Sequence, residues 1–183
     1  AYFLKKKVPQ VKLIDRTFNY DKKRAYEIIR YLVENDNGVT AFHLEICADL
    51  LDGMTIRLLS KARKGQFELE MGIQSTNPET LFEINRNHDV ESVLNNIKKL
   101  TAAGNLHTHV DLIAGLPGET YEMFGRSFND VYGLGADALQ LGFLKVLKGT
   151  AIEDRTEQYG IKYRSKAPYE VISTDSISAE ELI

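Results

Sequence analysis

Three polar residues lie in otherwise apolar stretches of the sequence, where a ligand could use them. Glu45 and Asp111 are each embedded in a short apolar run, and Gln74 ends a third such run. An unpaired charge in apolar surroundings costs several kcal/mol, so each carboxylate needs a partner, a ligand or water. Each residue alone could instead serve a neighbouring loop amide or a core arginine. Because the three lie on successive runs, they favour a shared polar pocket.

The runs that carry these residues recur at regular spacing along the chain. Strands are expected at 11–14, 39–46, 67–73, 110–114 and 138–146, with helical patterns between them. Strands that alternate with helices at about 30-residue spacing predict βαβ units and a parallel sheet. In such folds, ligands bind at the carboxyl ends of the strands. We therefore expect an α/β fold with helices on one side of a curling sheet or on both sides of an open one, and its about five strands are fewer than the eight of a closed TIM barrel.

The composition narrows the function classes further. The 183 residues suit about one domain, and a net charge of −3 gives no broad positive field, which argues against nucleic-acid binding. The sequence shows neither a signal peptide nor a run of ~18 apolar residues, so we expect a cytoplasmic protein without a membrane helix. The one cysteine, Cys47, cannot form an intrachain disulfide or supply several thiolates to a metal.

Four strings at the predicted strand ends occur together and in order. They are DRTFN at 15–19, FHLEI at 42–46, MGIQSTNPE at 71–79 followed by INR at 84–86, and VDLIAGLPGET at 110–120. With this set, the chain resembles the radical S-adenosylmethionine (radical SAM) superfamily. Within it, the chain is most similar to the branch with an N-terminal cobalamin-binding domain, which includes the anaerobic Mg-protoporphyrin IX monomethyl ester cyclases. The resemblance covers residues 11 to about 150.

This resemblance implies a fold and a division of the chain. The family fold is an incomplete (β/α)6 barrel, of which residues 1–150 would hold strands three to six and a following strand. Residues 151–183 would form a truncated C-terminal extension. The C-x-x-x-C-x-x-C motif that holds the family's 4Fe-4S cluster is absent from this sequence. The resemblance therefore implies a C-terminal fragment of the radical SAM core, and both ends of the sequence are interpreted as truncated.

The resemblance also implies a cofactor site and a reaction. Glu45 matches the carboxylate that contacts the methionine end or the ribose of S-adenosylmethionine, and Gln74 and Asp111 match groups that hydrogen-bond the ribose hydroxyls. Arg86 matches the arginine that pairs with the cofactor carboxylate, a partner that suits a guanidinium. The full-length protein would be an iron–sulfur oxidoreductase or transferase that cleaves S-adenosylmethionine reductively to a 5′-deoxyadenosyl radical. Cobalamin could take part, the substrate is a small molecule or unknown, and the fragment alone is expected to be inactive.

Two other functions stay open at this point, together with one partner. Another TIM-barrel enzyme, lyase or aldolase-like, would use Lys145 or Lys148 as its amine. A non-catalytic binding module could share the same fold. The strand expected at 11–14 would become an exposed parallel edge, which invites pairing with a second copy of the chain. We therefore predict a homodimer through that edge.

Overall fold

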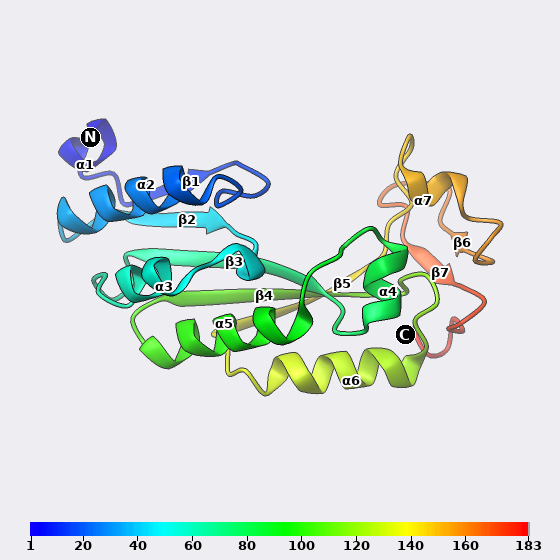
Figure 1. Ribbon diagram of the computed structural model, residues 1–183. Coiled ribbons are helices and arrows are strands. Elements are labelled where there is room, and N and C mark those ends of the chain that lie inside the picture. The colour runs from blue at the N-terminus through cyan, green and yellow to red at the C-terminus, as the bar shows by residue number, and fades with distance from the viewer. Residues whose placement is uncertain (183) are drawn as a thin grey trace. The chain divides into compact units, whose positions relative to one another are not determined.

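Strands and helices alternate along the chain in the computed structural model, which describes residues 1–182 (Figure 1). Five strands form one sheet in the order β1-β2-β3-β4-β5, and β1 pairs in parallel with β2, as β2 does with β3. The predicted α/β class with five parallel strands is therefore confirmed. The strands are β1 (Gln10–Leu13), β2 (Ala41–Glu45), β3 (Phe67–Gln74), β4 (His107–Ala114) and β5 (Ala138–Phe143).

Several strand ends differ from the expected ones, and β4 begins at His107 rather than at residue 110. β2 begins at Ala41 rather than at residue 39, since Val39 is 46% exposed. β5 ends at Phe143 rather than at residue 146. The residues after it pair with the C-terminal segment: the amide of Val146 donates to the carbonyl oxygen of Tyr169 over 2.9 Å, and the carbonyl oxygen of Leu144 accepts the amide of Val171 over 2.8 Å. Leu144 and Val146 therefore pack in the core of unit 2 without belonging to β5.

Backbone proximity divides the chain into two units. Unit 1 comprises Ala1–Gly72, Asp89–Val110 and Val131–Leu139, and unit 2 comprises Ile73–His88, Asp111–Asp130 and Gln140–Ile183. β3, β4 and β5 run from one unit into the other. Each unit is made of three separate segments of the chain. The predicted division at residue 150 stays a prediction.

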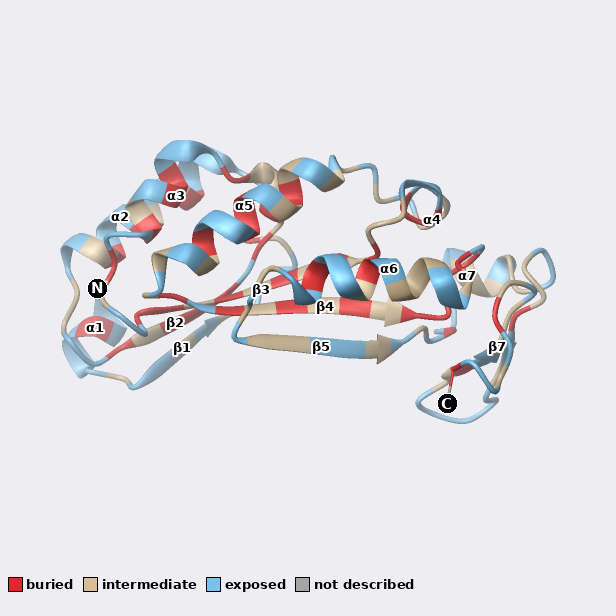
Figure 2. Ribbon diagram, turned by 90° about the horizontal axis from the view of Figure 1, so that it is seen from below, coloured by how far each residue is buried: buried red, intermediate tan, exposed pale blue. Residues whose placement is uncertain are grey.

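Unit 1 packs helices against one side of its strands. In Figure 2, α2 (Lys22–Glu34), α3 (Gly53–Leu59) and α5 (Val90–Ala103) lie together on one side of β1 and β2, with buried residues toward the strands. Aspartates cap all three helices: the side chains of Asp21, Asp52 and Asp89 each accept a backbone N–H of the first turn. α5 ends at Gly104, whose φ of 68° suits glycine. The same unit contains α1 (Tyr2–Lys6) and the short 3-10 helix η1 (Ala48–Leu50).

The two faces of the strands in unit 1 differ in polarity. Along β3 the buried residues alternate with half-buried ones, because successive side chains point to opposite faces. Leu69 and the other buried residues of β3 contribute to the apolar core. On the alternate positions, His43 places Nε2 2.8 Å from Oε2 of Glu70 and Nδ1 3.3 Å from Oε1 of Glu68. These side chains give one face of the strands a polar character.

Unit 2 has its own apolar core. It contains α4 (Pro78–Glu83), most of α6 (Tyr121–Tyr132), α7 (Ala151–Asp154) and the antiparallel pair β6 (Lys162–Tyr163) and β7 (Val171–Ser173). Ala114, at the end of β4, packs with residues of the C-terminal segment, which thus contributes side chains to this core up to Leu182. The buried members are Ala114, Val146, Ile161, Val171, Ile177 and Leu182.

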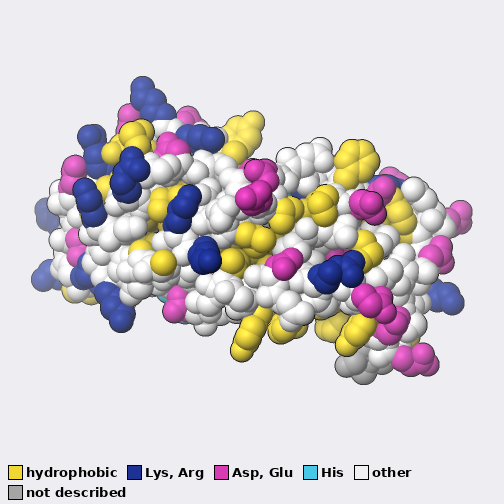
Figure 3. Space-filling view, turned by 60° about the horizontal axis from the view of Figure 1, so that its bottom comes forward, with side chains coloured by type: hydrophobic (Ala, Val, Ile, Leu, Met, Phe, Trp, Pro, Cys, Tyr) yellow, Lys and Arg dark blue, Asp and Glu magenta, His cyan; other side chains and the backbone are white. Residues whose placement is uncertain are grey.

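Within residues 1–182, no helix is both long and apolar enough to cross a membrane. On the face that Figure 3 displays, lysine and arginine side chains are mixed with aspartate and glutamate. β1 is one edge of the sheet, as the predicted dimer requires, and the dimer itself stays a prediction.

Candidate functional site

The structure places three of the four predicted site residues in unit 2. Gln74 is the last residue of β3, Asp111 lies within β4, and Arg86 follows α4 in the chain. Glu45 is the last residue of β2, belongs to unit 1 and is exposed. Gln74, Asp111 and Arg86 are half-buried, which leaves each side chain part accessible and part held by the protein.

Gln74 is the residue around which the site is built. Its φ is 72°, in the left-handed region that non-glycine residues rarely adopt. Its side-chain Oε1 is buried and has no hydrogen-bond partner among the described residues. A backbone held in this region costs of order 1–3 kcal/mol, and such positions concentrate at functional sites. An unmet acceptor on a strained residue at a strand end is a group that a ligand could satisfy.

Two cavities share Gln74 as part of their walls. One has a volume of about 320 Å³ and includes Arg86 among its lining residues, while the other, about 370 Å³, includes Asp111. Gln74 therefore stands between a cavity with a cation and a cavity with a carboxylate, all within unit 2. The first cavity is lined by Gln74, Glu83, Ile84, Asn85, Arg86, Ile113, Leu116, Leu144, Thr150, Ala151, Ile152 and Arg155.

The first cavity, which we call the arginine cavity, has the character of a small-molecule site. Its apolar wall comes from β4, the turn after it and the residue that follows β5, and includes Ile113, Leu116 and Leu144. A few polar groups, among them Arg86, complete the lining. Its volume lies at the lower end of the ~300–1,000 Å³ found for ligand pockets, which are mostly apolar with few polar groups. A planar apolar ring with a charged tail would suit it.

Local sequence explains how Arg86 reaches this cavity. α4 begins at Pro78, and the Asn77 side chain caps it by accepting the amides of Glu79 and Thr80, each over 3.0 Å. The helix closes after six residues, and Asn85 then adopts a φ of 57°. The amide of Arg86 donates to the carbonyl oxygen of Leu81 over 2.8 Å. This turn fixes the backbone from which the guanidinium extends.

The second cavity, which we call the aspartate cavity, is more polar. Its lining includes Asp111, Gln140 of β5 and Lys145, which lies two residues beyond that strand. Lys145, the amine of the lyase alternative, thus lines the same cavity as a carboxylate, whereas Lys148 lines neither cavity and is exposed. A carboxylate and a carboxamide at one edge can accept hydrogen bonds from neighbouring hydroxyls.

A buried carboxylate that sequence reasoning missed is hydrogen-bonded to Ser75, the residue after Gln74. Glu119 is 1% exposed, and its Oε1 accepts a hydrogen bond from the Ser75 hydroxyl over 2.5 Å. Its Oε2 is buried without a hydrogen-bond partner in the described part of the chain. Burial raises the pKa of Glu119 to about 7, while the hydrogen bond from Ser75 acts in the opposite direction. The only sequence signal was its place in the GLPGET string, which does not reveal burial.

A second group that sequence reasoning missed borders the arginine cavity. The Arg155 guanidinium lies 2.6 Å from the carboxylate of Glu83, and both residues line this cavity. The Tyr159 hydroxyl donates to the same carboxylate. The pKa of Glu83 is lowered, first by the hydrogen bond from Tyr159 and then by that from Arg155. Residues this far apart in sequence carry no spacing signal that could have paired them.

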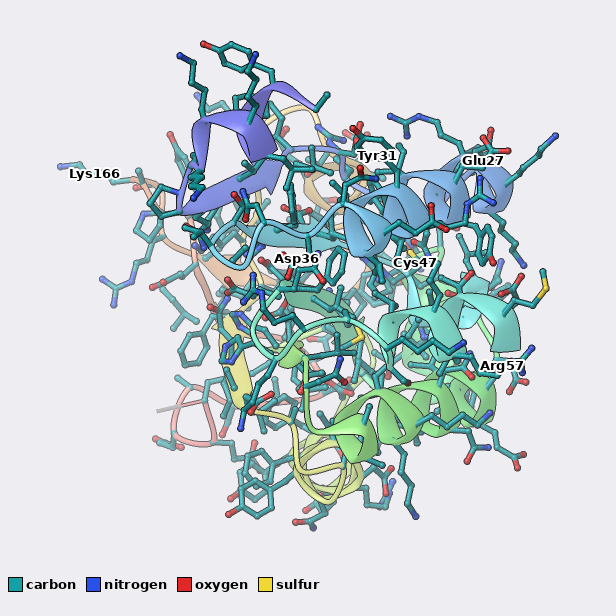
Figure 4. The ribbon with its side chains drawn as sticks, turned by 90° about the vertical axis from the view of Figure 1, so that its left-hand side faces the viewer. Glu27, Tyr31, Asp36, Cys47, Arg57 and Lys166 are labelled. Atoms are coloured by element: carbon teal, nitrogen blue, oxygen red, sulfur yellow. The ribbon has the colours of Figure 1, made fainter. Side chains whose placement is uncertain are left out.

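The described residues offer no alternative metal centre. They contain no group of three or more His, Cys, Asp or Glu side chains placed to hold a metal ion. Cys47 lies just after β2 (Figure 4), and its backbone is held by Asn19. Asn19 Nδ2 donates to the Cys47 carbonyl oxygen over 2.8 Å, and the Cys47 amide donates to Asn19 Oδ1 over 2.9 Å. This arrangement anchors a loop.

Comparison with protein families finds two matches. A model of the Radical SAM superfamily matches residues 1–131. A model described as a protein of unknown function, DUF4080, matches residues 157–183. Among curated proteins, the chain is similar to the heme chaperone HemW of Bacillus subtilis strain 168, with 25% identity over 115 residues. That match covers 63% of this chain and 30% of HemW, so the chain spans about a third of the relative's length.

Solved structures share the arrangement of strands and helices. Coproporphyrinogen III oxidase (HemN) of Escherichia coli, a radical SAM enzyme, superposes with a TM-score of 0.64 at 25% identity, over 76% of this chain and 32% of HemN. The radical SAM methyltransferase TsrM of Kitasatospora setae, solved with cobalamin and a [4Fe-4S] cluster, gives a TM-score of 0.73 at 17% identity. This likeness covers 92% of this chain and 35% of TsrM, and at that identity it speaks for the fold alone.

Proposed function

The chain belongs to the radical SAM superfamily and has the fold of a partial radical SAM barrel, and from this premise we propose that its two cavities form part of a binding site for S-adenosylmethionine. In this proposal Arg86 pairs with the methionine carboxylate, and Gln74 and Asp111 accept hydrogen bonds from the ribose hydroxyls. The apolar wall of the arginine cavity would receive the adenine. Glu45 belongs to unit 1, and its contact to the methionine end or ribose stays a prediction.

One observation carries this proposal. Gln74 borders both cavities, has a left-handed backbone and keeps a buried oxygen without a described partner. A ribose hydroxyl can donate to that oxygen, which would recover hydrogen-bonding free energy that the ligand-free protein forgoes. The arginine cavity supplies a guanidinium for the ligand carboxylate and an apolar wall for the adenine, and Asp111 of the aspartate cavity supplies an acceptor for the ribose. The donor set therefore fits S-adenosylmethionine.

The residues of this chain do not fit the iron–sulfur cluster of the family. A four-iron cluster is held by cysteine thiolates, and the sequence has one cysteine, Cys47, whose backbone is tied into a loop. We infer that cluster ligands must come from outside these 183 residues and that this chain alone does not cleave S-adenosylmethionine. The complete protein would act as an enzyme, since the family consists typically of enzymes, and its substrate would be a small molecule or unknown. A cobalamin domain stays a prediction, supported by the sequence strings.

The lyase alternative has one supporting observation, the position of Lys145 in the aspartate cavity. Family membership favours the nucleoside site, and a Schiff-base enzyme would need a carbonyl substrate that the lysine could reach. Borohydride trapping of a carbonyl compound on Lys145 would revive this alternative. A non-catalytic binding module would bind the same nucleoside as the enzyme. Nucleoside binding to this chain therefore does not distinguish the two functions, and only the activity of the complete protein would.

Binding to this chain tests the proposal. Ligand-observed NMR should detect weak binding of S-adenosylhomocysteine, a stable analogue with the same ribose and carboxylate. Arg86→Gln and Asp111→Asn should each weaken it, because each removes a charge that the ligand would meet. The matched control is Arg57→Gln, since Arg57 is exposed on α3 in unit 1 (Figure 4). Binding that is unchanged in both site variants would refute the proposed site.

A further inference from the structure

Three side chains of unit 2 form a clasp, by which we mean Glu83, Arg155 and Tyr159. Arg155 Nη2 lies 2.6 Å from Glu83 Oε2, and its Nη1 donates to the Glu83 carbonyl oxygen over 2.8 Å. The Tyr159 hydroxyl donates to Glu83 Oε2, and the Arg155 guanidinium carbon lies 4.8 Å from the centre of the Tyr159 ring. The clasp thus fixes both the side chain and the backbone of Glu83.

The clasp acts on the turn that carries Arg86. Glu83 is the last residue of α4, and Arg86 follows three residues later, after Asn85 with its left-handed backbone. Arg155 holds the Glu83 carbonyl oxygen, one of the groups that a helix end leaves without an intrahelical partner. Because so short a helix has little stability of its own, contacts from elsewhere must hold its end in place. The clasp supplies such contacts.

The segment that carries the clasp also builds the cavity wall. Thr150, Ala151 and Ile152 line the arginine cavity beside Arg155. Tyr159 is not among the lining residues, so it influences the cavity through Arg155 and Glu83. Thr150, Ala151, Ile152, Arg155 and Tyr159 all lie beyond residue 131, where the match to the superfamily model ends. This part of the cavity wall is therefore a feature of the chain's C-terminal segment.

We propose that residues 150–159 are a specificity element of the nucleoside site, in which the clasp positions Arg86 for the carboxylate of the ligand. This inference rests on the proposed function. The clasp is charge-assisted but partly solvated, with side-chain exposures of 30% for Arg155 and 35% for Glu83. A solvated ion pair contributes little to global stability. The clasp therefore acts on the orientation of the turn that carries Arg86 rather than on the free energy of unfolding. Tyr159 and Glu83 are positioning residues in this account.

Two ligands that differ in the amino-acid portion test the clasp. S-adenosylhomocysteine carries the carboxylate, whereas 5′-methylthioadenosine has the same nucleoside and thioether without it. Tyr159→Phe removes a hydrogen bond of the clasp without altering the cavity lining. We expect it to weaken S-adenosylhomocysteine by roughly 3- to 10-fold, the loss of about one hydrogen bond, and to leave 5′-methylthioadenosine unchanged. Arg155→Gln should change the ratio of the two Kd values in the same direction.

The outcomes separate this inference from the proposed function. Arg86→Gln should reproduce the change in the Kd ratio, and the exposed Tyr20→Phe serves as the matched control. If Arg86→Gln changes the ratio but Tyr159→Phe and Arg155→Gln do not, the inference is wrong and the proposed site stands. If Arg86→Gln leaves the ratio unchanged, the proposed site itself is wrong.

A measurement without ligand makes the inference testable on its own. In the ligand-free chain, Tyr159→Phe should shift the amide resonances of Asn85 and Arg86 in a proton–nitrogen correlation spectrum. Tyr20→Phe should leave those resonances in place. Unchanged resonances of Asn85 and Arg86 in the Tyr159→Phe variant would overturn the inference, whatever the chain binds.

Discussion

The Ser75 hydroxyl donates a hydrogen bond of 2.5 Å to the buried carboxyl of Glu119 and thereby joins two turns that border the candidate site. Ser75 directly follows Gln74 at the end of β3, and Glu119 lies in the turn between β4 and α6. The Ser127 hydroxyl lies 3.3 Å from the Ser75 hydroxyl and accepts the amide of Thr76 over 3.0 Å. A buried polar network thus holds Ser75 and Thr76, the two residues that directly follow Gln74.

The first prediction concerns the pH dependence of stability. Burial raises the pKa of Glu119 to about 7 in the folded chain, above its unfolded value, so the folded state binds the proton more tightly. The contribution of this group is present at low pH and is lost as pH rises through about 7, by up to about 3 kcal/mol in unfolding free energy. Glu119→Gln should remove that part of the dependence, as measured by urea denaturation from pH 5 to about 8.

The control for this prediction is an exposed glutamate. Glu27→Gln changes a side chain on the solvent side of α2 (Figure 4) and should keep the wild-type pH dependence. Asp130, which accepts the Thr76 hydroxyl over 2.8 Å, is another acid of the network, and Asp130→Asn measures its separate contribution to stability. An identical loss of stability with pH in wild type and Glu119→Gln would contradict the assignment.

The second prediction concerns the backbone of Gln74. At a φ of 72°, a β-branched residue is strained, so Gln74→Val should lower the unfolding free energy by about 1–2 kcal/mol. Gln74→Gly removes the strain and the unpartnered oxygen, and its stability should match wild type within about 1 kcal/mol. Both variants should bind S-adenosylhomocysteine more weakly. Equal stability of the Val and Gly variants would show that the left-handed backbone is not retained in solution.

The third prediction concerns the cap of α4. Asn77→Ala removes the acceptor for two amides of the first turn and should cost about 1 kcal/mol of stability. Because α4 leads into the turn that carries Arg86, the variant should also weaken S-adenosylhomocysteine. Asp21→Ala removes the cap of α2 in unit 1 and should cost similar stability without altering ligand affinity. Comparable affinity losses in both variants would mean that α4 has no special role.

The fourth prediction concerns the sheet edge at β1. An edge strand leaves backbone groups available to a second chain, and Ile14, just beyond β1, is 95% exposed. We expect concentration-dependent dimers in sedimentation velocity and a shift toward monomer in Ile14→Lys, which adds charge at the edge. A clean monomer of the wild-type chain at high concentration would rule out this dimer.

The sequence was sufficient to predict those features that local patterns determine. The strand–helix alternation and the polar residues Gln74 and Asp111 leave a signature within a few neighbouring positions. No local signature showed that residues 144–146 pair with the C-terminal segment instead of belonging to β5. Glu119 and Ser75 are 44 residues apart, and Arg155 and Glu83 are 72 apart, so their pairing depends on tertiary packing. For the same reason the sequence could not show that the C-terminal segment lines the arginine cavity.

The central claim is that the nucleoside binds between the arginine and aspartate cavities, and mapping the amide resonances during a titration tests it most directly. With S-adenosylhomocysteine added to the labelled chain, the largest shifts should fall on residues 74–76, 84–86 and 111–116. Arg86→Gln should reduce those shifts at equal ligand concentration. Shifts centred elsewhere in the chain, or no shifts at saturating ligand, would contradict the proposed site.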